Sequence, residues 1–202
     1  MILKSMIVGP VGTNCYLIGD ETAGVCALVD PGDQAQDLLA MAADTGLTLS
    51  AIFLTHGHYD HRDAVPDILK ACPDLPVHIH YKERYQESLP SRYFYNGPCV
   101  TYGEGDAVSV GSLSFKVLET PGHTAGSVCL LSDDLLFAGD TLFAGSCGRC
   151  DLPGGSMEDM FHSLRRLSEI PGDRQVFSGH GPSTTLAAER KTNPYMRRAM
   201  TL

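Results

Sequence analysis

Residues 55–61 place four potential metal ligands within one short segment. The segment follows the apolar run 51–54, which has the composition of a buried strand, and leads into a helical pattern. Side chains two residues apart point to the same side of an extended chain, so the first two imidazoles can hold one ion. The turn into the helix then directs the other two ligands to a neighbouring point. These four residues are His56, His58, Asp60 and His61.

Three further ligand-type residues occur in the same context. His123, Asp140 and His180 each have a neighbouring glycine, and each follows one of the apolar runs 113–118, 135–138 and 175–177. The carboxyl ends of strands in one layer gather along a single edge, where α/β folds place their sites. The sequence therefore predicts that all seven residues converge at one sheet edge.

The order of elements predicts an α/β fold made of two similar halves. Helical patterns cover 34–45, 61–70 and 156–167, the last with Ser156 as N-cap. We interpret 81–102 as a helix and a loop that join the halves. Strand pairs come first, strands then alternate with helices, and this order repeats after about residue 100, which a helix-covered sandwich of two sheets satisfies. The predicted strands are 15–18, 26–29, 51–54, 77–80, 113–118, 128–131, 135–138 and 175–177.

Five imidazoles and two carboxylates are too many for one tetrahedral ion, because catalytic zinc typically takes three protein ligands and a water. Two divalent ions about 3.5 Å apart are therefore expected. We assign His56, His58 and His123 to the first ion. Asp60, His61 and His180 are assigned to the second, with Asp140 bridging. A water shared by the ions would supply hydroxide as the nucleophile at neutral pH, because zinc lowers the pKa of bound water to about 7.

Length and charge narrow the class of protein. A chain of 202 residues with a net charge of −9 is expected to form one domain and to avoid nucleic acid. No apolar run approaches the about 20 residues that cross a bilayer, and the N-terminus has no signal-peptide pattern. Seven cysteines, an odd number, fit buried free thiols. We therefore expect a cytoplasmic protein that does not interact with membranes. The sequence does not determine its oligomeric state.

Several other residues have two possible roles. Arg149 and Cys147 lie in the loop after Asp140, which can reach the mouth of the site, so they are candidate substrate contacts. A surface ion pair for Arg149 and an ordinary loop for Cys147 are the alternatives. Tyr59 either forms a wall of the pocket or packs against neighbouring side chains. Asp30 either orients a ligand imidazole or begins a turn. The two histidines at 78 and 80 fit one face of an exposed strand and are not expected to bind metal.

The motif His56-x-His58-x-Asp60-His61, with His123, Asp140 and His180 downstream, resembles the metallo-β-lactamase superfamily. The resemblance extends nearly end to end and includes residues 13–16 and 29–32. It implies a four-layer αββα sandwich, with two mixed sheets and helices on the outer faces. Asp140 stands where true zinc β-lactamases commonly have cysteine.

Residues 139–143 and 145–149 look like the hydroxyacylglutathione hydrolases (glyoxalase II), which cleave S-D-lactoylglutathione. The resemblance implies a binuclear thioester hydrolase that uses zinc, with iron or manganese as alternatives, and a small-molecule thioester substrate. Asp60, His61 and Asp140 are its expected catalytic residues. Because the sequence ends soon after His180, we expect no C-terminal helical substrate domain. Compact bacterial glyoxalase II-like proteins are therefore more similar, and the thiol carrier is left open.

Two alternatives remain at this stage. Persulfide dioxygenases share the ligand set and a very similar Gly-Cys-Gly-Arg loop, and that resemblance implies a single iron on His56, His123 and Asp140. The other alternative is a metal-binding module without catalysis. Metal content and substrate turnover distinguish the three.

Overall fold

A computed structural model describes residues 1–202. One group of strands comprises β1 (Ile2–Val8), β2 (Thr13–Asp20), β3 (Val25–Val29), β4 (Thr48–Leu54), β5 (Val77–His80) and β6 (Val100–Tyr102). A second group comprises β7 (Ala107–Val110), β8 (Leu113–Glu119), β9 (Val128–Leu131), β10 (Leu135–Gly139), β13 (Gln175–Ser178) and β14 (Thr184–Thr185). A small hairpin comprises β11 (Leu142–Phe143) and β12 (Ser146–Cys147). The helices are α1 (Ala35–Ala43), α2 (Tyr59–Arg62), α3 (Val65–Ala71), α4 (Met157–Ser168), α5 (Leu186–Thr192) and α6 (Pro194–Ala199), with 3₁₀ turns η1 (Tyr81–Glu83) and η2 (Ser91–Tyr93).

Each group of strands forms one mixed sheet of six strands. The first has the order β1-β2-β3-β4-β5-β6, antiparallel up to β3 and parallel from β3 to β6. The second has the order β14-β13-β10-β9-β8-β7, in which only the β10–β13 pair is parallel. Strands β8, β10 and β13 therefore run in the same direction, and their carboxyl ends lie at the same edge.

Alternating side chains on each strand build the two faces of the first sheet. In β2, Leu17 joins the cluster that contains Leu38 of α1 and Ile68 of α3. Its neighbours Tyr16 and Ile18 face the opposite way, into the core between the sheets. There the ring of Tyr16 lies 5.5 Å from that of Phe137 in β10. Strand β2 of the first sheet is therefore buried on both faces.

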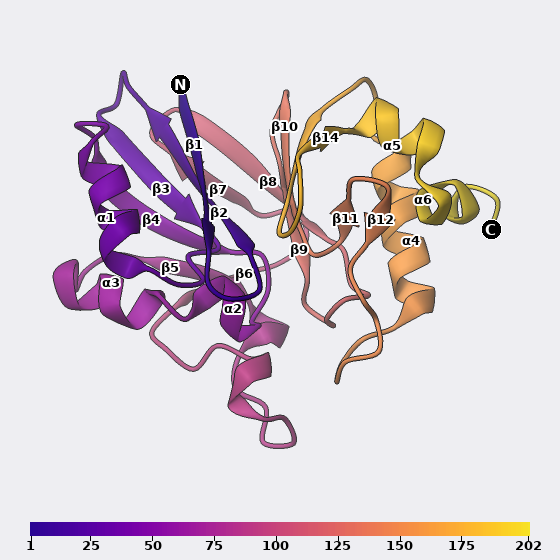
Figure 1. Ribbon diagram of the computed structural model, residues 1–202, viewed down its shortest axis with the longest axis horizontal. Coiled ribbons are helices and arrows are strands. Elements are labelled where there is room, and N and C mark those ends of the chain that lie inside the picture. Colours follow the sequence, from indigo (N-terminus) through magenta and orange to yellow (C-terminus); the bar gives the residue numbers. More distant parts are fainter.

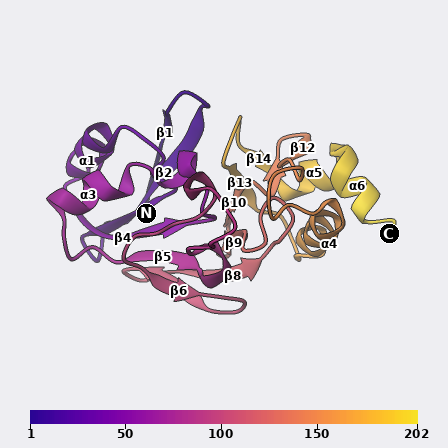
Figure 2. The ribbon, with the colours of Figure 1, turned by 90° about the horizontal axis from the view of Figure 1, so that it is seen from below.

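The second sheet is covered by α4, α5 and α6. Leu136 of β10 packs with Met160 and Leu164 of α4, on the face opposite Phe137. Helix α4 begins as predicted, because the Ser156 side chain accepts a hydrogen bond from the backbone N–H of Asp159 at 3.1 Å. The layers thus follow the order helices, sheet, sheet, helices, which confirms the αββα sandwich (Figure 1; Figure 2).

Two sequence-based expectations about helices are wrong. The pattern at 61–70 is split between α2 and α3 by residues 63–64. Pro66 begins a new helix there, because it has no N–H to bond the carbonyl one turn earlier and fits the first turn of a helix best.

Residues 81–102 contain no α-helix. The segment forms the turns η1 and η2 and then β6, which extends the first sheet beside β5. Pro90, Gly97 and Pro98 interrupt the segment before a helix can form. None of the helices in the structure is long and apolar enough to cross a membrane.

Candidate metal centre

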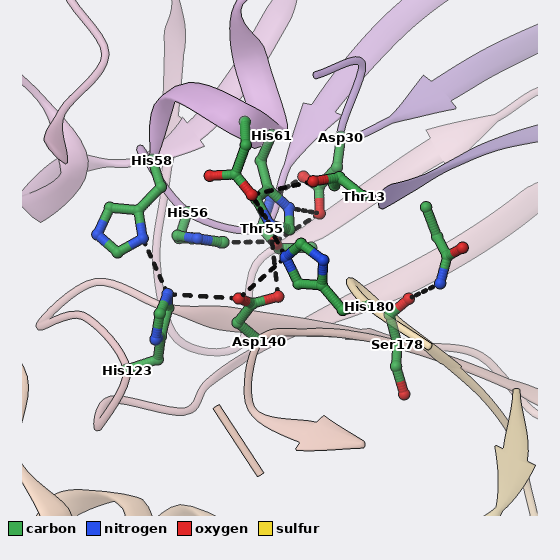
Figure 3. Close-up of polar contacts among 12 residues, drawn as sticks. Thr13, Asp30, Thr55, His56, His58, His61, His123, Asp140, Ser178 and His180 are labelled. Carbon is green, nitrogen blue, oxygen red and sulfur yellow. Dashed lines mark hydrogen bonds and ion pairs between the residues drawn. The ribbon is translucent and has the colours of Figure 1, made fainter. Parts of the chain in front are cut away.

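The seven predicted ligands come together where the carboxyl ends of strands from both sheets meet. His56, His58, Asp60 and His61 follow β4 of the first sheet, and His123, Asp140 and His180 follow β8, β10 and β13 of the second. The prediction of a single sheet edge is therefore wrong, although the side chains do converge (Figure 3). The sandwich brings two edges together, and each edge contributes part of the site.

Three overlapping groups of these side chains are close enough to hold metal ions. In each group the potential ligand atoms all lie within 4.8 Å of one another. The groups are His56, His58 and His123; Asp60, His61 and His180; and His56, His61 and Asp140. The first two match the two predicted ligand sets, and the third spans both sets and includes Asp140. The cluster therefore has the composition and spacing of a centre for divalent metal ions.

Several buried atoms in the cluster have no hydrogen-bond partner. They include Nε2 of His56, Nε2 of His61 and Oδ1 of Asp140. A buried polar atom left unpaired costs about 1–3 kcal/mol, so folded proteins rarely leave several together. Zinc, iron and manganese bind neutral imidazole nitrogens and carboxylate oxygens as ligands. The residues present thus fit divalent cations.

His61 is held from behind by Asp30. Oδ2 of Asp30 lies 3.0 Å from Nδ1 of His61 and accepts a hydrogen bond from Thr55 Oγ1 at 2.7 Å. The other oxygen, Oδ1, accepts from the backbone N–H of Thr55, also at 2.7 Å. The contact fixes the ring so that Nε2 faces the site. Of the two roles expected for Asp30, the structure shows the orienting one.

The backbone around Asp30 is adapted to this contact. Asp30 has φ of 54°, a conformation that residues other than glycine rarely adopt. At Gly32, an added Cβ would lie 1.6 Å from the backbone oxygen of Asp60. Only glycine allows the loop after β3 to approach the loop after β4 so closely.

His123 is oriented by a backbone carbonyl. Its Nδ1 lies 2.7 Å from the carbonyl oxygen of Arg149, and its Nε2 lies 2.9 Å from Nδ1 of His58. The Arg149 side chain points elsewhere and makes a two-pronged ion pair with Asp151, at 2.7 Å for both contacts. Arg149 therefore acts on the cluster through its main chain, and its guanidinium forms the surface ion pair that the sequence left as the alternative.

Two further residues tie β2 to the cluster. Thr13 donates a hydrogen bond from Oγ1 to Oδ2 of Asp60 at 2.9 Å. Asn14 donates from Nδ2 to the carbonyls of Ser178 and Gly181, which flank His180. Side-chain patterns do not reveal these partners, because two of the acceptors are backbone atoms. The one signal for Thr13 and Asn14 is that they fall within residues 13–16 of the family resemblance.

Charges within the cluster separate the imidazoles into two kinds. Burial, followed by the neighbouring His123 and His61, lowers the pKa of His58 to about 3. Burial also opposes protonation of His61, but Asp140, Asp30 and Asp60 outweigh it and raise the pKa of His61 to about 9. In the absence of metal, His58 is therefore neutral and His61 holds a proton at neutral pH.

Tyr59 and Cys147 are the other two residues predicted to contact the substrate. Tyr59 is 37% exposed and lines a cavity of about 580 Å³. Cys147 is half-buried in β12 and packs against the core under α4. The aromatic rings of Tyr93 and Phe143, which the sequence did not single out, lie 5.4 Å from His58 and 6.0 Å from His180. No periodic pattern marks Tyr93, because it lies in the irregular segment before β6.

The two remaining histidines of interest are outside the cluster. His80 is fully buried, and its Nε2 lies 2.8 Å from Oε1 of Glu119. His78 packs beside Phe53 at 5.4 Å between ring centres. The exposed-strand interpretation is wrong, because β5 lies between β4 and β6 and all four of its residues are buried or half-buried. Neither residue belongs to a potential metal-binding group.

The sequence profile described as Metallo-beta-lactamase superfamily matches residues 8–180, which include all seven residues of the cluster. The chain belongs to the metallo-beta-lactamase superfamily. Together with the His/Asp cluster, membership makes it a metal-dependent hydrolase of this superfamily.

Two relatives represent different parts of the superfamily. The "Probable metallo-hydrolase YqgX" of Bacillus subtilis is 36% identical over 96% of this chain and 96% of that protein. A "Hydroxyacylglutathione hydrolase" of Psychromonas ingrahamii is 39% identical over 82% of this chain. The match covers 60% of that relative. The chain is thus similar to one relative over its whole length and to the other over part of it.

Solved structures of the superfamily share the fold closely. The BLEG-1 B3 metallo-beta-lactamase has a TM-score of 0.87 at 32% identity, over 96% of this chain and 99% of that chain. TTHA1623 in a di-iron-bound form has a TM-score of 0.81 at 37% identity, over 95% and 99%. ETHE1 from Myxococcus xanthus has a TM-score of 0.82 at 32% identity, over 96% and 84%.

Proposed function

We propose that the protein hydrolyses a small-molecule thioester of the S-D-lactoylglutathione type at a centre of two divalent ions. The position of Asp140 carries the proposal. Its Oδ1 lies 3.4 Å from Nε2 of His61, and its Oδ2 lies 3.5 Å from Nε2 of His123. One carboxylate thus faces an imidazole from each ligand group, which is the arrangement that a bridging ligand between two ions requires.

The remaining ligands divide between two ions. His56, His58 and His123 would hold the first, and Asp60, His61 and His180 the second. When bound, the ions would supply hydroxide at neutral pH and polarise the carbonyl of the substrate. Zinc suits three-ligand sites of this composition, and the di-iron form of TTHA1623 makes iron the main alternative.

The chain's own residues position this chemistry. Asp140 lies between the groups, with Oδ2 also 3.6 Å from Nε2 of His180. Asp60 lies 3.3 Å from His180 and is fixed by Thr13. Asp60, His61 and Asp140 would thus orient both ions relative to the scissile carbonyl. A thioester needs little further help, because its thiolate is a good leaving group and no general acid has to protonate it.

A cavity at α2 would suit the anionic end of a substrate. It has a volume of about 580 Å³ and is lined by Tyr59, Arg62, Asp63 and Arg92, and by none of the seven ligands. Arg62 is partly engaged by Asp63, whereas Arg92 is exposed. Guanidinium groups recognise carboxylates, which glutathione carries. Arg149 would be a further contact if a substrate carboxylate replaced Asp151 as the partner of its guanidinium. Cys147 and Tyr59 complete the set of proposed contacts.

The hydroxyacylglutathione hydrolase of Psychromonas ingrahamii supports the choice of thioester, since it is 39% identical over 82% of this chain. Persulfide oxidation at a single iron on His56, His123 and Asp140 is the second candidate, favoured by the likeness to ETHE1. Binding without catalysis is the third. The complete second group, Asp60, His61 and His180, favours two ions over one.

Metal analysis combined with two assays tests the proposal. The purified chain should contain two divalent ions and release free thiol from S-D-lactoylglutathione. It should not consume oxygen with glutathione persulfide. One iron per chain with oxygen uptake would replace the proposal by the second candidate, and bound metal without either activity would leave the third.

A further inference from the structure

A buried glutamate lies outside the ligand set but next to it. Glu83 ends the turn η1 and is 2% exposed. Its Oε2 accepts a hydrogen bond from the backbone N–H of Gly57 at 2.7 Å. Its Oε1 accepts one from the backbone N–H of Gly126 at 2.8 Å. Both oxygens are thus engaged by main-chain donors from two different loops.

These two loops carry all three imidazoles of the first group. Gly57 stands between His56 and His58, in the loop after β4 of the first sheet. Gly126 follows His123 by three residues, in the loop after β8 of the second sheet. The Glu83 carboxylate therefore connects the two sheets at the point where the first group is assembled.

Both loops have glycine where Glu83 approaches. A Cβ on Gly126 would lie 2.7 Å from Oε1 of Glu83. A Cβ on Gly57 would lie 3.0 Å from Oε2 of Glu83 and 3.0 Å from Cα of Phe94. Any larger residue at either position would move the carboxylate or the loop. Glycine at both positions thus allows the Glu83 carboxylate to approach both loops.

We infer that Glu83 is a positioning residue that holds the His56–His58 loop and the His123 loop at the separation the first metal ion needs. The hydrogen bonds are charge-assisted, and a carboxylate is the one side chain that accepts at both ends without offering a donor. Helix α2, which carries Asp60 and His61, and the loop with His180 make no hydrogen bond to Glu83. The effect should therefore be selective for the first group. The inference rests on the proposed ligand assignment.

Glu83→Gln tests it with little change in size. The amide NH₂ would face one of the two backbone N–H donors, so one loop would lose its acceptor. We expect the affinity of the first group for Zn²⁺ to fall about 10- to 100-fold, as for other residues that orient ligands, and the second group to keep its affinity. Titration of metal-stripped protein with Zn²⁺ against a competing chelator measures both affinities.

Two backgrounds identify which site is affected. With His180→Ala, which weakens the second group, Glu83→Gln should leave no tightly bound Zn²⁺. With His123→Ala, which disrupts the first group, Glu83→Gln should change the remaining affinity less than threefold. Equal losses in both backgrounds would overturn the inference, as would two unchanged affinities in the single variant.

Glu189→Gln is the matched control. Glu189 is also 2% exposed and also accepts a backbone hydrogen bond, from Gly145 at 2.8 Å, but it lies in α5 and makes no hydrogen bond to either loop of the first group. It should lower the melting temperature without changing either Zn²⁺ affinity. If Glu83→Gln fails to fold, Gly126→Ala displaces the same carboxylate from the other side and should give the same selective loss.

The inference and the proposed function fail differently. Two Zn²⁺ sites without thioester hydrolysis would contradict the function and leave the Glu83 test intact. One iron per wild-type chain, held by His56, His123 and Asp140 as in the second candidate, would contradict the binuclear proposal but would still depend on both loops that Glu83 connects. Glu83→Gln must then weaken it, and an unchanged affinity would overturn the role of Glu83.

Discussion

Asp30 and His61 link the turn after β3 to the second ligand group: Oδ2 of the buried carboxylate lies 3.0 Å from Nδ1 of the imidazole. The contact leaves Nε2 of His61 facing Asp140 and Asp60, at 3.4 Å from each. A strained backbone at Asp30, with φ of 54°, is part of the same arrangement. Asp30 therefore orients one imidazole of the second group.

Asp30→Asn should weaken metal binding at the second group. Asparagine keeps the shape but loses the charge, and its amide nitrogen must face either Thr55 or His61, both of which need an acceptor. We expect a 10- to 100-fold lower Zn²⁺ affinity, about the size found for other partners of ligand imidazoles. Chelator competition measures it. Asp33→Asn, on the exposed side of the same loop, should leave the affinity as it is. A normal affinity in Asp30→Asn would show that the contact does not orient His61.

Metal binding should release a proton from His61. Carboxylates around the buried ring raise its pKa to about 9, so the metal-free protein at pH 7.5 holds a proton that an incoming cation must displace. Affinity should therefore rise with pH up to about 9 and level off above it. Titration calorimetry in buffers of different ionisation enthalpy counts the released protons. Binding without proton release at pH 7.5 would contradict this charge state.

Much of the fold could be predicted from periodicity alone. The strands that bury both faces, such as β3 and β10, have uninterrupted apolar runs, and α4 has a clear cap. The elements missed are short or half exposed. Strand β1 is largely exposed, β6 has three residues, and α5 and α6 have seven and six. Patterns of that length do not distinguish a helix from a strand.

The site could be predicted as far as its ligand-type side chains, because four of them share one motif. The partners that orient them could not, since several act through the main chain. The carbonyl of Arg149 holds His123, and Glu83 binds two backbone N–H groups. Side-chain identity carries no signal for such contacts. The three ligands after β8, β10 and β13 were predicted, but not their origin in a second sheet, because the assignment of strands to sheets is a tertiary property.

Asp140→Ala should remove the bridge between the ligand groups. We expect turnover of S-D-lactoylglutathione to become undetectable and the metal content to fall below two per chain, because imidazoles of both groups face this carboxylate. His78→Ala is the control, since His78 packs beside Phe53 and joins no potential metal-binding group. Metal content by elemental analysis and thioester turnover are measured for both variants. Similar behaviour of the two variants would show that the ligand assignment is wrong.

Gly179→Ala should damage the centre without changing any ligand. An added Cβ would lie 2.2 Å from Oδ1 of Asp140 and 2.7 Å from Cε1 of His61, so those side chains must move. Gly103→Ala is the matched control, because the nearest atom to its Cβ, Oε1 of Glu119, is 3.7 Å away. We expect at least a tenfold loss of metal affinity in Gly179→Ala alone, measured by chelator competition at a temperature where circular dichroism shows both variants folded. The added methyl group can be accommodated in this packed site only if its neighbours move. Retention of two tightly bound ions would therefore mean that Asp140 and His61 can be displaced without loss of metal affinity.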